Sequence, residues 1–297
     1  MNEQAVVFPA EGEELLGILH HGAPGATRGV LVVVGGPQYR VGSHRQFVLL
    51  ARHLAGAGVP VFRFDYRGMG DAGGAARDFS DVGADIAAAI DAFQQHRPDL
   101  REVVLWGLCD AASAGLAHAW QDPRVSGLVL LNPWVRTDEG LARAQLKGYY
   151  LQRLFSRDLW SGLVRGRIHP VRSLRALLGT LGTALARGDR HETAEAATNA
   201  PAGQGTDPLR SLPLPERMAA GWRRFDGPIL LILSGDDLTA AEFRDATRRM
   251  SAWRGLLEEA RVTIRELDAA NHTFSRAEWR DQVADWTREW VAETARG

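Results

Sequence analysis

Cys109 stands where a short apolar run gives way to a segment that favours a helix. The surrounding residues read WGLCDAA at 106–112, directly after the apolar run EVVLW at 102–106. This order resembles the G-x-S-x-G turn, in which a nucleophile lies between a strand and a helix and small neighbours relieve the crowding. Gly107 and Ala111 meet that demand, and the helix N-terminus would favour a thiolate. Since a free cysteine is more often a small buried core residue, a catalytic role for Cys109 depends on its partners.

A histidine and two aspartates could supply those partners. His272 follows the apolar run at 262–267, and Asp236 and Asp237 follow the run at 228–233. The order cysteine, aspartate, histidine is the order of nucleophile, acid and base that accompanies the G-x-S-x-G turn. The imidazole would draw the proton from the thiol, and the carboxylate would orient the imidazole and stabilise its cation. We expect one aspartate to serve in this way and the other to cap the following helix.

The segment after the apolar run at 30–34 could hold the oxyanion of an acyl-transfer reaction. It reads GGPQYR at 35–40 and occupies the place of the loop that supplies one oxyanion-hole N–H. Because Pro37 has no N–H, Gln38 is the expected donor, with the backbone N–H of Asp110 as the second. The alternative is a plain Gly-Pro turn, and without a Walker or G-x-G-x-x-G pattern the segment is a poor phosphate site. As substrate contacts we consider Tyr39, Arg40, Trp134, Arg165 and Arg167.

Alternating strands and helices must position these residues. The pattern predicts strands at 14–21, 30–34, 59–64, 102–106, 125–131, 228–233 and 262–267, and helices at 44–57, 81–96, 110–120, 240–260 and 276–294. Buried apolar strands that alternate with helices indicate an α/β fold with a mainly parallel sheet covered on both faces, and we expect the earliest strands to form an antiparallel edge. Ligands bind beyond the carboxyl ends of such strands, so the motifs above are expected to meet there.

The alternation stops between residues 136 and 226, which we interpret as a helical cap or lid inserted into a core of 1–135 and 227–297. From 136 to 175 the chain has nine basic and three acidic residues, with aromatic residues interleaved. This region is either a solvated basic face or a surface for an anionic acyl carrier or a membrane.

Length and composition restrict the function classes. The chain has 297 residues, 45% hydrophobic and 24% charged, with a formal net charge of −1. This balance gives no global footprint for nucleic acid. No apolar run reaches the about 20 residues that span a bilayer, and the first ten residues lack the features of a secretory signal. With a single cysteine no disulfide can form within the chain, so a cytoplasmic location is the default expectation.

Four segments resemble bacterial hydrolases of the α/β-hydrolase superfamily that are associated with the exosortase A system (type 1). They are VVVGGPQYRVGSHRQF, FDYRGMGD, LWGLCDAASA and LSGDDLTAAEF. The resemblance implies an α/β-hydrolase fold, a hydrolase-like enzyme from exopolysaccharide and protein-sorting gene clusters, and Asp237 as the catalytic acid. In FDYRGMGD we interpret Asp65, Arg67 and Gly70 as structural.

These residues favour acyl transfer through a covalent thioester, with an ester, thioester or lactone as the substrate. The acyl group would come from a small molecule or a carrier, and neither a metal nor an organic cofactor is required. Two alternatives remain open. One is an acyltransferase that passes the acyl group to an alcohol or amine, and the other is a non-catalytic binding protein on the same fold.

Overall fold

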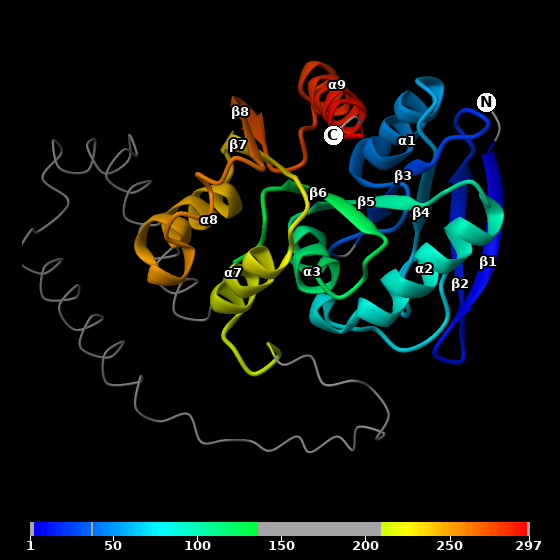
Figure 1. Cartoon of the computed structure of the whole chain (residues 1–297), viewed down its shortest axis with the longest axis horizontal. Coiled ribbons are helices and arrows are strands. Elements are labelled where there is room, and N and C mark those ends of the chain that lie inside the picture. The colour runs from blue at the N-terminus through cyan, green and yellow to red at the C-terminus, as the bar shows by residue number, and fades with distance from the viewer. Residues whose placement is uncertain (1–2, 37, 136–208, 296–297) are drawn as a thin grey trace, which may run out of the picture. The chain divides into compact units, whose positions relative to one another are not determined.

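The computed structural model describes residues 3–36, 38–135 and 209–295, which build one twisted sheet with helices on both faces (Figure 1). The strand order is β1-β2-β4-β3-β5-β6-β7-β8. The strands are β1 (Glu3–Ala10), β2 (Glu13–His20), β3 (Arg28–Val33), β4 (Val61–Phe64), β5 (Glu102–Leu108), β6 (Val125–Leu131), β7 (Ile229–Asp236) and β8 (Val262–Asn271). β1 and β2 are antiparallel, whereas β4, β3 and β5 to β8 run parallel. The predicted mainly parallel sheet with an antiparallel edge is confirmed.

Successive residues of the central strands pack into two separate hydrophobic cores. In β5, Leu105 belongs to the core beneath α2 (Gly83–His96), α3 (Asp110–Ala119), α7 (Leu214–Arg224) and α8 (Leu238–Arg249). Its neighbour Trp106 belongs to the core beneath α1 (Gln46–Gly56) and α9 (Ala277–Thr294). Because both faces of these central strands are covered, their sequences are continuous apolar runs and do not alternate between apolar and polar residues.

One predicted helix is considerably longer than the observed one. The helix predicted at 240–260 ends at Arg249 and gives way to a 3-10 turn, η3 (Ser251–Trp253). Trp253 is buried there, with edge-on ring contacts to Trp222 and Phe243, and its indole N–H donates to the carbonyl of Pro215. This tertiary packing overrides the local preference for helix.

Helix α7 lies outside the predicted core boundaries. The described residues belong to one compact unit, which joins the segments before residue 138 and after residue 207. α7 packs against α3 and η3 within this unit, because its Trp222 is fully buried. The prediction that an insertion begins near residue 136 and caps the site concerns residues outside the described ranges. Within the described residues no helix is long and apolar enough to cross a membrane.

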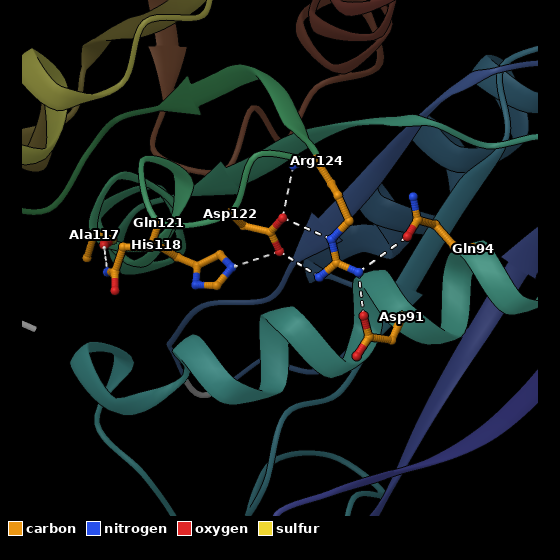
Figure 2. A network of polar contacts seen from close by, with 7 residues as sticks. All are labelled: Asp91, Gln94, Ala117, His118, Gln121, Asp122 and Arg124. Atoms are coloured by element: carbon orange, nitrogen blue, oxygen red, sulfur yellow. Dashed lines mark hydrogen bonds and ion pairs between the residues drawn. The ribbon is translucent and has the colours of Figure 1, made fainter. Parts of the chain in front are cut away.

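A polar network fixes the turn between α3 and β6, at the end of α3 opposite Cys109 (Figure 2). The Arg124 guanidinium donates to both carboxylate oxygens of Asp122, from Nε at 2.9 Å and from Nη2 at 2.7 Å, and it also reaches Asp91 and Gln94. His118 Nε2 lies 3.8 Å from the same carboxylate, too far for a hydrogen bond. Burial would raise the pKa of Asp122, but the His118 ring and the Arg124 guanidinium outweigh burial and lower it.

We expect Arg124→Ala to lower the free energy of unfolding by about 1–3 kcal/mol, because the buried Asp122 carboxylate loses its charged partner. The folded-state pKa of Asp122 is depressed, so this contribution is present above the unfolded pKa of ~3.9 and is lost as pH falls below it. Urea unfolding at neutral and acidic pH measures both effects. Gln121→Ala is the matched control, since among the described residues the contact of its exposed amide is with the Ala117 carbonyl. An equal loss in both variants would contradict the importance of the network.

Candidate active site

The parallel strands end at one edge of the sheet, and each is followed by polar or small residues. The segments that follow β3, β5, β6, β7 and β8 contain Gly36, Cys109, Asn132, Asp237 and His272, respectively. Since neighbouring parallel strands carry their carboxyl ends to the same side, segments far apart in sequence meet here. The segments that carry the sequence motifs therefore lie along one edge of the sheet.

Cys109 occupies a sharp strand-to-helix turn. Its backbone has φ 63° and ψ −124°, in a region that non-glycine residues rarely adopt. A Cβ on Gly107 would lie 2.6 Å from the carbonyl carbon of Ala111, so only glycine fits at that position. Such strain persists where the surrounding structure enforces it, most often at functional sites. The turn thus projects the thiol from the N-terminus of α3.

The residues after β6 hold the backbone of Cys109 from the other side. The Cys109 N–H donates to the carbonyl of Leu131 at 2.8 Å, and the Trp134 N–H donates to the carbonyl of Cys109 at 3.2 Å. The Ser113 hydroxyl then donates to the carbonyl of Trp134 at 2.7 Å. The position of the thiol is therefore fixed by main-chain bonds on both sides of the turn.

His272 and Asp237 form a pair beside the thiol. His272 Nδ1 lies 2.9 Å from Asp237 Oδ2, and the carboxylate side chain is only 6% exposed. The hydrogen bond to Asp237 and then the nearby Cys109 side chain raise the pKa of His272 to about 10, against the effect of burial. Asp236 is exposed and is not the aspartate that His272 contacts. This arrangement gives His272 a proton that it holds at neutral pH between a thiol and a carboxylate.

Asp237 also caps helix α8, so the expectation that one aspartate caps and the other pairs with His272 was wrong. Its two carboxylate oxygens accept from the backbone N–H groups of Thr239 at 3.2 Å and Ala240 at 3.0 Å. Burial would raise the pKa of Asp237, but the bond and charge of His272 and these two N–H groups lower it. A single carboxylate has enough acceptor sites for all three donors.

The segment after β3 is tied to the turn at Cys109 through the side chain of Asp110. This carboxylate accepts from the Gly36 N–H at 2.7 Å and from the Ala111 N–H at 3.0 Å. A Cβ on Gly35 would come within 2.1 Å of it, so the loop can approach only as glycine. Burial raises the pKa of Asp110, despite opposing hydrogen bonds from the N–H groups of Gly36, Ala111 and Asp110 itself.

The two expected oxyanion donors differ in whether their backbone N–H groups already have an acceptor. The Gln38 side chain accepts from the Ser43 N–H at 3.1 Å, and within the described part of the chain its own backbone N–H donates to no protein acceptor. An oxyanion would have to share the Asp110 N–H with the Asp110 carboxylate. The assignment of these two donors stays a prediction.

The candidate substrate contacts differ in what they touch. The guanidinium of Arg40 pairs with buried Asp65 and, at 2.7 Å, with Asp71, so it anchors the loop after β3 to the loop after β4. Tyr39 is 47% exposed, with the Arg40 guanidinium 5.9 Å from its ring. Trp134 bonds Cys109 through its backbone, and Arg165 and Arg167 lie outside the described residues. Contact of any of these five with a substrate stays a prediction.

The motif FDYRGMGD serves the fold, as interpreted from the sequence. The Arg67 guanidinium donates to both carboxylate oxygens of buried Asp85, at 2.7 and 2.9 Å. Gly70 has φ 54°, and a Cβ there would lie 2.3 Å from Asp65. Within the described residues, no group of three or more His, Cys, Asp and Glu side chains is placed to hold a metal ion.

Sequence reasoning missed Asn132. This residue directly follows β6, is fully buried and has φ 42°. Its side chain contacts both Ser234 and the backbone of His272. The only signal in the sequence is an asparagine at the end of an apolar run, which by itself predicts a turn.

A family model described as the alpha/beta hydrolase family matches residues 18–286, nearly the whole chain. The chain belongs to the alpha/beta hydrolase family. The strand order and the sharp turn at Cys109 agree with that membership, and the protein is accordingly a hydrolase. No curated protein sequence matches this alpha/beta hydrolase significantly.

Solved structures resemble this alpha/beta hydrolase in fold. The esterase Pf2001 from Pyrococcus furiosus has a TM-score of 0.63 at 14% identity, covering 99% of this chain and 91% of that one. Est1E from Butyrivibrio proteoclasticus, solved with ferulic acid bound, has a TM-score of 0.63 at 12% identity, covering 99% and 100%. The alpha/beta hydrolase GrgF from Penicillium sp. sh18 has a TM-score of 0.59 at 13% identity, covering 99% of each chain. At these identities the likeness establishes the fold alone.

Proposed function

We propose that this alpha/beta hydrolase cleaves an ester, thioester or lactone through a thioester acyl-enzyme formed on Cys109. The observation that carries the proposal is the pairing of His272 with Asp237 beside a cysteine held in a strained turn at a helix N-terminus. A thiolate is the nucleophilic form of cysteine, and an adjacent imidazolium and a helix N-terminus both favour it. The esterase Pf2001 among the structural neighbours supports ester chemistry.

The proposed reaction begins with the attack of the Cys109 thiolate on the acyl carbonyl. A carbon–sulfur bond forms, and the carbonyl electrons move to the oxygen, which the backbone N–H groups of Gln38 and Asp110 would stabilise. The carbonyl then re-forms, and the alkoxide or thiolate that leaves takes the proton of the His272 imidazolium. Asp237 stabilises that cation before transfer and orients the ring.

Deacylation reverses these roles. Neutral His272 takes a proton from water, the resulting hydroxide attacks the thioester, and the carbon–sulfur bond breaks to release the acid and the Cys109 thiolate. An alcohol or amine in place of water would give acyl transfer instead. The finer assignments, to exosortase A-associated hydrolases and to a carrier-bound or membrane-linked substrate, form part of the proposal and rest on the sequence resemblance and on the basic residues of 136–175.

Matched substrates test the bond class. With one short acyl group, we expect kcat/KM for the p-nitrophenyl ester and an alkyl thioester to exceed that for the p-nitroanilide by more than about 100-fold, or about 2.7 kcal/mol of barrier. The reason is that a thiolate leaves a tetrahedral intermediate more easily than an unprotonated amine does. Comparable turnover of the anilide would contradict the proposal. Product analysis with added methanol or glycerol separates hydrolysis from acyl transfer.

A further inference from the structure

We propose that Asn132 is a positioning residue that holds His272 against Cys109, an inference that rests on the proposed function. The polar contacts of Asn132 connect the ends of three neighbouring strands: β6, which carries it, β7, which leads to Asp237, and β8, which leads to His272. Asn132 touches neither the thiol nor the imidazole in any contact of the described residues, so it acts through the backbone of its partners.

The backbone of Asn132 is held in an unusual conformation. Its φ of 42° lies in the left-handed region, which asparagine tolerates better than most residues other than glycine. The side chain is fully buried, and the backbone N–H donates to the carbonyl of Ile232 at 3.1 Å. This conformation ends the strand and turns the side-chain amide toward β7.

The amide group of Asn132 extends the hydrogen-bonded ladder between β6 and β7. Regular pairing of these strands ends at Leu131 and Ile232. Beyond that point the Ser234 N–H donates to Asn132 Oδ1 at 2.9 Å, and Asn132 Nδ2 donates to the Ser234 hydroxyl at 2.7 Å. The side chain thus replaces a missing peptide group and fixes the segment that leads to Asp237.

The same Nδ2 atom donates to the backbone carbonyl of His272 at 3.1 Å. On the other side of this loop, Asn271 accepts from the Ser275 N–H at 3.1 Å and donates to the Ser275 hydroxyl at 2.8 Å. Asn132 therefore ties the His272 backbone to β6, whereas the Asn271 side chain closes the loop on Ser275.

Two adjacent residues, Leu131 and Asn132, hold the backbones of Cys109 and His272. The carbonyl of Leu131 accepts the Cys109 N–H, and the amide of Asn132 holds the carbonyl of His272. Any shift of Cys109 relative to His272 must therefore break a buried hydrogen bond, which costs free energy. Of the described charged groups, Asp237 faces His272 and Asp110 adjoins Cys109.

Alkylation of Cys109 tests the inference without a substrate, because it is the only cysteine in the chain. Iodoacetamide reacts with the thiolate, so its rate against pH reports whether His272 stabilises that form. In the wild type we expect fast alkylation to persist at pH 6. In Asn132→Gly, which keeps the positive φ without strain but removes the amide, we expect the pH 6 rate to fall by about tenfold or more, toward that of a free thiol of pKa ~8.5, with the rate at pH 9.5 nearly unchanged.

Two matched variants separate positioning from general loss of stability. Ser234→Ala removes the hydroxyl partner of Asn132 but keeps the contact with His272, and Arg124→Ala destabilises the far end of α3. Both should retain the wild-type alkylation profile. If Asn132→Gly does not fold, Asn132→Asp keeps the shape and the acceptor for Ser234 while losing the donor to His272, and it should show the same loss at pH 6.

The outcomes distinguish the two proposals. A wild type that alkylates slowly at pH 6 would overturn the ion pair and with it the proposed function. Fast alkylation in the wild type together with an unchanged profile in Asn132→Gly or Asn132→Asp would overturn only the positioning role. A shift of the alkylation profile in Arg124→Ala equal to that in Asn132→Gly would also overturn the positioning role, since destabilisation alone would then explain the slower alkylation at pH 6.

Discussion

Cys109→Ala is expected to abolish turnover of activated esters, lowering kcat by up to ~10⁶-fold, the loss measured when a covalent nucleophile is removed from another hydrolase. The physical reason is that no other group of the described site is placed to attack between His272 and the expected oxyanion donors. Steady-state kinetics with a p-nitrophenyl ester measures the effect, and circular dichroism verifies the fold.

Cys109→Ser is the matched control for the thiol itself. A serine hydroxyl needs a neutral imidazole to remove its proton, whereas the hydrogen bond to Asp237, the largest cause that raises the pKa of His272, remains in this variant. We therefore expect turnover of the serine variant to stay far below that of the wild type at neutral pH. In the wild type, the imidazolium proton is present below pH 10, so acylation should hold steady through neutrality and fall as pH rises through about 10. A serine variant as active as the wild type would contradict a dedicated thiol.

Asp237→Asn is expected to have the second largest effect. In a serine triad the equivalent change cost ~10⁴ in kcat, and we expect a smaller loss here because a preformed thiolate–imidazolium pair depends less on the acid. The variant also loses charge at the N-cap of α8, where Asp237 accepts from Thr239 and Ala240. Its free energy of unfolding should therefore fall as well, by up to about 1 kcal/mol.

Asp236→Asn is the control one residue away. Because Asp236 is exposed and does not contact His272, both turnover and stability should stay close to wild type. Measuring kcat/KM on one activated ester and urea unfolding for both variants separates the two roles of Asp237. If Asp236→Asn were the inactive variant, the assignment of the acid would be off by one residue. If neither mattered, the site would operate with Cys109 and His272 alone.

The sequence is informative where a local rule links a motif to its place in the fold. Apolar runs predict the parallel strands, and a parallel sheet brings the ends of those strands together, so Cys109, Asp237 and His272 could be expected to meet. Small residues at Gly107 and Ala111 predict the sharp turn, which the backbone of Cys109 adopts.

The sequence is uninformative where a partner comes from a distant segment. The sequence places Arg40 in the expected oxyanion loop, but only the folded structure shows that its guanidinium pairs with Asp65 and Asp71. Similarly, Asn132 ends an apolar run, and only the folded sheet places Ser234 and His272 around its amide. Helix α7 was missed because its burial depends on packing of Trp222 against Trp253, more than thirty positions along the chain.

Trapping the covalent intermediate tests the central claim most directly. The enzyme is mixed with an excess of a p-nitrophenyl ester, quenched in acid within milliseconds to seconds, and analysed by intact-mass spectrometry and peptide mapping. We expect a single acyl group on Cys109, formed in step with a stoichiometric burst of p-nitrophenol, removed by neutral hydroxylamine as thioesters are, and missing in Cys109→Ala. Turnover by Cys109→Ala at the wild-type rate, or an acyl group found on another residue, would contradict the account.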